Sequence, residues 1–137
     1  MLVDADESAW SSWNRFAEDF AADTGARIVR IDDGGITGDA FYVHVRKIGA
    51  AVLASPKRHT AAIPPSLGQR PVTDPVPLWT WSLLHRHDDD RVGVRGVVDS
   101  LLALARSHDW LVPPAERWWI PAGDPHRGVL ESGAGLR

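Results

Sequence analysis

The 137-residue sequence contains no cysteine, which excludes disulfide bonds and thiolate chemistry. It also lacks an excess of basic residues: the formal net charge is −3, and lysine and arginine are scattered rather than gathered in a stripe. This charge pattern argues against direct DNA binding by this chain. No apolar run reaches the length of a membrane span, and the acidic residues 1–7 lack the basic and apolar segments of a signal peptide. We therefore predict a cytoplasmic protein without a membrane partner.

Features that catalysis and metal binding need are also missing. None of the serines at positions 55, 66, 82 and 100 stands on the sharp glycine-flanked turn of a hydrolase nucleophile. Residues 85–90 contain histidines and aspartates that could bind a divalent cation, but no spaced partner pair elsewhere completes a site. The helix dipole alone favours acidic residues at a helix start. We expect no enzymatic activity, no cofactor and no bound metal.

The first half of the chain has the pattern of strands alternating with helices. Residues 2–3 predict a strand fragment, and residues 8–24 predict a helix that Asp6 or Ser8 caps and Gly25 ends. Its apolar stripe comprises Trp10, Trp13, Phe16, Ala17, Phe20 and Ala21. The large aromatic side chains indicate that this helix packs against a sheet.

A second set of elements predicts a βαβ unit. Residues 27–31 alternate like a strand, a loop follows at 32–39, and an apolar-periodic helix ends at Gly49. The continuous apolar run 50–54 is typical of a parallel strand that is covered on both faces. We further predict a short turn at 56–60 and a weak edge strand at 67–72.

The loop at 32–39 is a candidate ligand site. It follows a strand and precedes a helix, where free backbone N–H groups and the helix dipole favour a small ligand. An ordinary tight turn between strand and helix explains the same glycines about as well, because they lack phosphate-loop spacing.

Residues 76–107 form the other predicted α/β unit. Residues 76–86 are rich in aromatic and β-branched side chains, with Pro75 and Pro77 only near the start, so they read as a strand. Asp90 is the expected N-cap of the helix that follows. The apolar stripe of that helix comprises Val94, Val97, Val98, Leu101, Leu102 and Ala105.

The last part of the chain has no periodicity. Residues 113–137 are rich in proline and glycine, and we predict an extended, partly disordered tail that follows a domain over residues 1–112. The run Trp118, Trp119 and Ile120 is the exception, because such an apolar group would be costly to leave in water.

The order of these elements resembles the C-terminal part of the effector-binding domain of LysR-type transcriptional regulators. The matching pieces are the aromatic helix, the strand–loop–helix at 27–48, the short turn at 56–60, and the strand and helix of residues 72–107. Residues 49–56 resemble that family's glycine-x-glycine, aliphatic, proline signature, with Ala51 in place of the second glycine. The resemblance covers about residues 2–107.

The resemblance implies a fold class and a function. The fold is α/β, a fragment of a type 2 periplasmic-binding-like fold with one small mixed or parallel sheet lobe, flanking helices, and a return strand and helix. The function is binding of a small-molecule effector by a truncated or split regulator whose DNA-binding domain is not in this chain. Carried over by position, the ligand-binding residues are Asp4, Ala5, Gly34, Gly35, Ile36, Thr37, Thr73, Asp74 and Pro75.

A second function class stays open. In that interpretation the chain is a stand-alone interaction protein that forms a homodimer, or docks a partner, through the helix at 94–107. We favour a homodimer, because a strand with open edges and an uncovered helix are both satisfied by a second copy.

Overall fold

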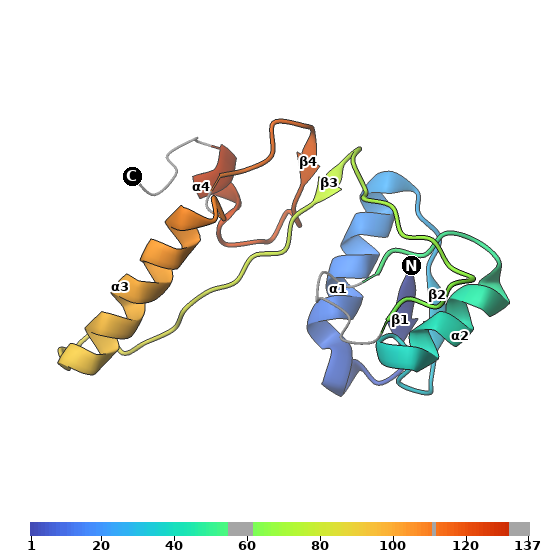
Figure 1. Cartoon of the computed structure of the whole chain (residues 1–137), viewed down its shortest axis with the longest axis horizontal. Helices are drawn as coiled ribbons and strands as arrows, with labels where there is room; N and C mark the ends of the chain where they lie inside the picture. The colour runs from blue at the N-terminus through green and yellow to red at the C-terminus, as the bar shows by residue number, and fades with distance from the viewer. Residues whose placement is uncertain (55–61, 111, 132–137) are drawn as a thin grey trace. The chain divides into compact units, whose positions relative to one another are not determined.

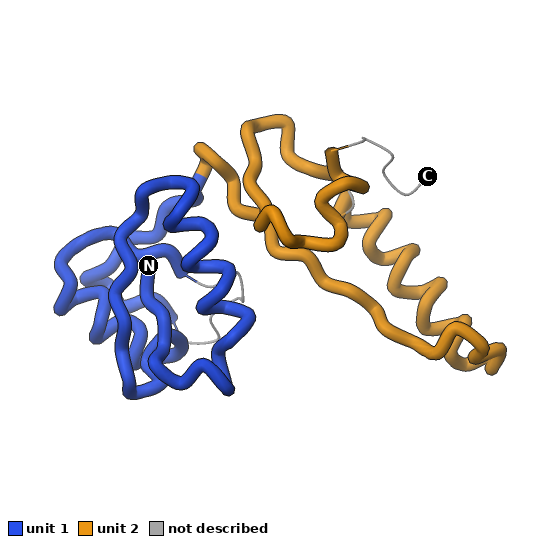
Figure 2. The backbone as a smooth tube through the Cα atoms, turned by 180° about the vertical axis from the view of Figure 1, so that it is seen from behind, with its two compact units in different colours: residues 1–72 blue, residues 73–137 orange. Residues whose placement is uncertain are grey.

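The computed structural model describes residues 1–54, 62–110 and 112–131. The chain divides into two compact units, Met1–Val72 and Thr73–Arg137 (Figure 2), and each is described by itself. The described residues form a mixed α/β structure with four helices and two small parallel sheets. The α/β class predicted from the sequence is therefore confirmed. None of the described helices is long and apolar enough to cross a membrane.

The first unit is built on two short parallel strands joined by a long helix. Strand β1 (Leu2–Asp4) pairs with β2 (Val29–Ile31), and α1 (Glu7–Thr24) connects them (Figure 1). Helix α2 (Gly38–Ile48) follows β2. The sequence pattern predicts the strand–helix–strand unit over residues 27–54. The structure forms this unit over residues 2–31 instead.

Helix α1 begins and ends at the predicted residues. The Asp6 carboxylate accepts hydrogen bonds from the backbone N–H groups of Ser8 (3.0 Å) and Ala9 (3.3 Å), so Asp6 is the N-cap. Gly25 ends the helix in the left-handed conformation at φ +73°, which glycine adopts without steric cost. The buried residues of the helix are Trp13, Asn14, Phe16, Ala17, Phe20 and Ala21. The apolar face is as predicted, except that it includes one asparagine and leaves Trp10 only half-buried.

Side chains of α1 also occupy the outer edge of β1. The Trp13 indole Nε1–H donates to the Leu2 carbonyl oxygen at 2.8 Å. The Asn14 side chain accepts from the Asp4 N–H at 3.0 Å and donates to the Asp4 carbonyl oxygen at 2.6 Å. These bonds take the place of a third strand, since unpaired backbone groups are costly to bury.

Helix α2 matches its prediction, but the strands expected after it do not form. The helix ends at Gly49 (φ +63°) and buries Phe41 and Tyr42. Neither residues 50–54 nor residues 67–72 belong to a strand, so both predictions are wrong. The apolar run 50–54 is at most half-buried and pairs with none of the strands in the described part of the chain. The turn predicted at 56–60 lies outside the described residues.

The second unit contains a two-residue parallel ladder and a long helix. Strand β3 (Val76–Pro77) pairs with β4 (Trp118–Trp119), and α3 (Val92–Ser107) lies between them in the chain. The N–H of Leu78 donates to the Trp119 carbonyl oxygen at 2.8 Å and ends the ladder. The strand predicted over 76–86 is therefore wrong beyond Pro77, because no strand of the described residues offers residues 78–86 a partner.

The segment predicted to be a tail contributes two elements to this unit. Strand β4 is followed by the short helix α4 (Arg127–Glu131). Trp119 and Ile120 are buried, as expected for the apolar run, and Ile120 is among the most buried residues of the chain. The Thr80 hydroxyl donates to the Asp124 carboxylate at 2.6 Å and fixes this segment to the residues that follow β3.

Helix α3 is the least covered helix of the described chain. Its N-cap is Arg91, without a side-chain capping bond, so the Asp90 cap predicted from the sequence is wrong. The Asp90 carboxylate instead pairs with the Arg95 guanidinium. No residue of α3 is fully buried; Val94, Val98, Leu102 and Ala105 are half-buried, whereas Val97 and Leu101 of the same predicted stripe are exposed.

Candidate functional site

The carboxyl ends of β1 and β2 lie together and bring part of the predicted site into one place. Asp4 ends β1, and the N–H of Ala5 donates to the Ile31 carbonyl oxygen at 2.6 Å. The loop 32–37 starts directly after Ile31. Asp4, Ala5 and the beginning of this loop therefore share one edge of the sheet, where α/β proteins commonly place ligands.

Asp4 is the most unusual residue of this edge. It is only 1% exposed, and its Oδ1 accepts a hydrogen bond from the Asp6 N–H at 2.8 Å. Its Oδ2 is buried and has no hydrogen-bond partner among the described residues. A buried polar atom without a partner costs about 1–3 kcal/mol, and more when the group is charged. Such an atom marks a position where a bound donor would remove the cost.

Asp33 organises the predicted loop. Its Oδ1 accepts a hydrogen bond from the Gly35 N–H at 3.0 Å, and both carboxylate oxygens lie 3.0 Å from His44 Nε2 on α2. The hydrogen bond from the Gly35 N–H, assisted by His44, holds the pKa of the Asp33 carboxyl below its usual range. The loop is thus fixed to α2 by a side-chain pair.

Glycine is required at position 35 by its neighbours. A Cβ there would lie 2.6 Å from His44 Nε2 and 2.7 Å from Asp33 Oδ1, closer than carbon atoms approach polar atoms. Gly34 is exposed and has φ +68°, the left-handed region that glycine tolerates. The two glycines therefore have structural reasons that do not depend on a ligand.

Two other predicted residues of the loop have different surroundings. Ile36 is 4% exposed and belongs to the core of the first unit, so it is not available to a polar ligand. Thr37 is the N-cap of α2, yet its side chain makes no capping hydrogen bond. The Thr37 hydroxyl therefore satisfies none of the backbone N–H groups in the first turn of α2.

The remaining predicted site residues belong to the second unit. Thr73 is exposed, Pro75 is buried, and the Asp74 Oδ1 accepts a hydrogen bond from Arg117 Nε at 2.7 Å. Asp4 and the loop at 34–37 belong to the first unit, Met1–Val72. A cleft that these residues share with Asp4 and the loop at 34–37 stays a prediction.

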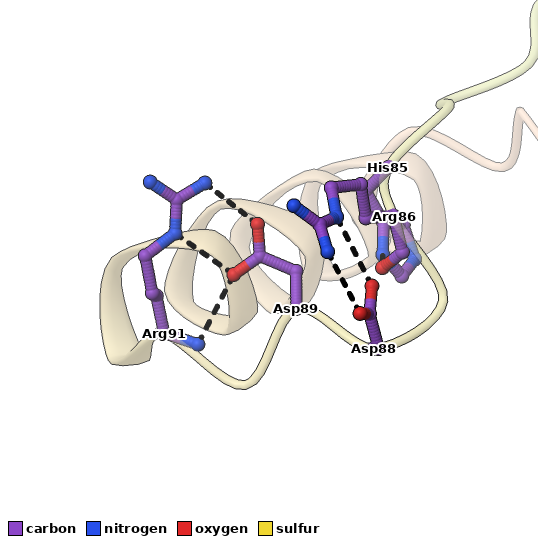
Figure 3. Close-up of polar contacts among 5 residues, drawn as sticks. All are labelled: His85, Arg86, Asp88, Asp89 and Arg91. Carbon is purple, nitrogen blue, oxygen red and sulfur yellow. Dashed lines mark hydrogen bonds and ion pairs between the residues drawn. The ribbon is translucent and has the colours of Figure 1, made fainter.

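A concave region lies at the start of α3. It is a cavity of about 280 Å³. In the turn that leads into α3, arginine side chains bind the neighbouring carboxylates (Figure 3). The Arg86 guanidinium donates to the Asp88 carboxylate, and the Arg91 guanidinium donates to the Asp89 carboxylate at 2.8 and 2.6 Å. The lining residues are His85, His87, Asp89, Asp90, Val94, Arg95, Val98 and Asp99.

These arginines neutralise the acidic turn. The Arg86 guanidinium lowers the pKa of Asp88, and the Arg91 guanidinium lowers the pKa of Asp89. Among the described residues, no three histidine, cysteine, aspartate or glutamate side chains are arranged to hold a metal ion. The turn at 85–91 is therefore a set of local ion pairs that precede a helix.

Asn14 is the residue of the candidate site that sequence reasoning missed. It is 4% exposed and holds both backbone polar groups of Asp4. A signal was present, because Asn14 lies four residues after Trp10 and three before Ala17, within the apolar stripe of α1. A polar side chain on such a stripe has to find buried partners.

Comparison of the chain with protein-family models, with curated proteins and with solved structures finds no significant match.

Proposed function

We propose that the first unit binds a small polar molecule at the carboxyl edge of β1 and β2, with Asp4 Oδ2 as the acceptor for a donor group of the ligand. The observation that carries this proposal is the buried, unpartnered oxygen of Asp4. Hydrogen bonds to a charged group contribute about 1.5–3 kcal/mol, enough to select one ligand orientation.

The charges around the site narrow the ligand chemistry. Asp4, Asp32 and Asp33 place carboxylates at or next to the ends of the two strands, and Asp33 is engaged by His44 and Gly35. An amine or hydroxyl donor matches this acceptor, whereas a carboxylate ligand would meet like charge. The ligand class we propose is therefore a small amine or polyol.

A more specific form of this proposal is that the small molecule is the effector of a LysR-type regulator, as the sequence resemblance implies. The order of helix, strand, loop and helix over residues 7–48 supports it. The strands that the resemblance requires at 50–54 and 78–86 do not form, and this counts against a periplasmic-binding-like fragment. The binding site proposed here depends only on the first unit.

A binding titration with matched variants tests the proposal. Native mass spectrometry of the purified chain would identify a retained ligand, and calorimetry with a panel of small amines, polyols and carboxylates would measure affinity. Asp4→Asn keeps an oxygen for the Asp6 N–H and replaces the free acceptor by a donor. We expect it to weaken binding about 10- to 100-fold. Asp23→Asn, on the exposed last turn of α1, is the control; equal affinities of wild type and Asp4→Asn would refute the site.

The alternative function, a stand-alone interaction protein, is favoured by a different observation. Helix α3 is 16 residues long and has no buried residue, which is unusual for a helix with a continuous apolar stripe.

A further inference from the structure

One half of the surface of α3 is exposed and carries no charge. With 100° per residue, the half-buried side chains occupy one sector of the helix, next to the charged residues Arg95, Asp99 and Arg106. The opposite half circle is exposed throughout, and its residues are Val92, Gly93, Gly96, Val97, Ser100, Leu101, Ala103, Leu104 and Ser107. A helix face that is exposed to water usually carries charged residues, so this uncharged half of α3 is unusual.

Small residues run along the middle of this face with the spacing of a helix seam. They are Gly93, Gly96, Ser100, Ala103 and Ser107, separated alternately by three and four residues. Within the described part of the chain nothing requires the glycines, since a Cβ at Gly93 or Gly96 would have no heavy atom there within 4 Å. Glycine inside a helix weakens it relative to alanine. A close approach by a second backbone would explain both glycines.

The two flanks of the seam differ in character. Val97 and Leu104 lie on one side, 55% and 41% exposed. Asp99 and Arg106, of opposite charge and seven residues apart, lie on the other. Among the described residues neither of these two side chains has an ion-pair partner, whereas carboxylates pair with the other described arginines of this unit, which are Arg86, Arg91, Arg95, Arg117 and Arg127.

We propose that α3 pairs antiparallel with α3 of a second copy of this chain, across a two-fold axis. With Ser100 facing Ala103 of the partner subunit, Asp99 lies beside Arg106 of the partner subunit, and symmetry forms this pair twice. The same alignment places Val97 beside Leu104 of the partner subunit. The alternative alignment, with Ser100 opposite Gly96 of the partner subunit, brings the two Asp99 carboxylates together and is disfavoured by like charge.

Such an interface needs exposed apolar side chains of the second unit in addition to α3. A pair of 16-residue helices alone covers only a few hundred Å² on each copy, below the ~800 Å² per partner of a standard interface. Trp81, Leu84, Trp110 and Val112 of the same unit are exposed by 77%, 90%, 64% and 65%. Together with the flank of α3 they supply on the order of 700 Å² of apolar area.

A pair of equally exposed residues provides the first test. Leu104 on α3 and Val43 on α2 are both 41% exposed. In sedimentation velocity on the full chain, we expect a concentration-dependent dimer that Leu104→Asp weakens tenfold or more, whereas Val43→Asp leaves it unchanged. Circular dichroism of each variant checks that α3 still forms. A wild-type chain that stays monomeric at hundreds of micromolar overturns the proposal.

A charge exchange tests the orientation. Asp99→Arg and Arg106→Asp should each weaken the dimer several-fold, because each creates two like-charge contacts, and the double variant should restore wild-type affinity. Gly96→Ala should raise the melting temperature of the isolated chain at low concentration and weaken the dimer, since the methyl group favours the helix but separates the pair. Additive losses in the double variant, or a dimer that Gly96→Ala strengthens, would contradict the antiparallel seam.

Discussion

The hydrogen bonds between Asn14 and the edge of β1 should be among the main local contributions to the stability of the first unit. Asn14→Leu keeps the branched shape and the number of side-chain heavy atoms but leaves the N–H and the carbonyl oxygen of Asp4 buried without these partners. Each lost partner costs about 1–3 kcal/mol, and the added apolar side chain returns about 1–2 kcal/mol. We expect a net loss of about 2–4 kcal/mol, a large part of the ~5–15 kcal/mol that stabilises a typical domain.

Urea denaturation followed by tryptophan fluorescence would measure this loss. Trp13→Phe, which removes the bond to the Leu2 carbonyl oxygen and part of a buried ring, should also lower the stability of the first unit. Ser12→Leu, on the exposed side of the same helix, should change the free energy of unfolding by less than about 0.5 kcal/mol. An Asn14→Leu protein as stable as wild type would show that side chains do not hold the β1 edge.

Three further predictions concern the loop and the glycines. Because the folded state lowers the pKa of Asp33, the contribution of Asp33 to stability is present above the usual carboxyl pKa of about 3.9 and disappears as the pH falls through the lower folded value. Acid titration of wild type and Asp33→Asn should therefore show a stability difference that vanishes in strong acid. A difference that persists in strong acid would contradict this prediction. Gly35→Ala should separate His44 from Asp33 and cost about 1 kcal/mol, and unchanged His44 ring resonances in the NMR spectrum would argue against it. Gly49→Ala should destabilise by about 1 kcal/mol because of its positive φ, and a thermal unfolding curve that matches wild type would refute the strain.

The helices could be predicted from the sequence because their signals are local. Asp6 and Gly25 bound α1 as expected, and Gly49 ends α2 as expected, since a cap acts on the backbone of its own helix. The apolar stripe of α3 was also found, but not its environment. Two of its six residues, Val97 and Leu101, are exposed, because a sequence pattern does not state what covers a helix face.

The strands could be predicted only in part because a strand needs a partner. Residues 50–54 and 78–86 have the composition of strands, yet neither finds a neighbour in the described chain. Conversely, Trp118 and Trp119 form β4 in a segment that looked like a tail, because Val76 and Pro77 pair with them. Asn14 shows the same limit for the site, since its importance arises from contact with a strand ten residues away.

The most direct test of the proposed binding site is a titration of isotope-labelled protein observed by NMR. With the tightest-binding amine or polyol of the panel as the probe, shifts of backbone amide signals should cluster at residues 4–5 and 32–37, and in Asp4→Asn they should need about 10- to 100-fold more ligand. Shifts confined to the cavity at the start of α3, where His85 and Asp89 lie, or an unchanged titration curve in Asp4→Asn, would contradict the account.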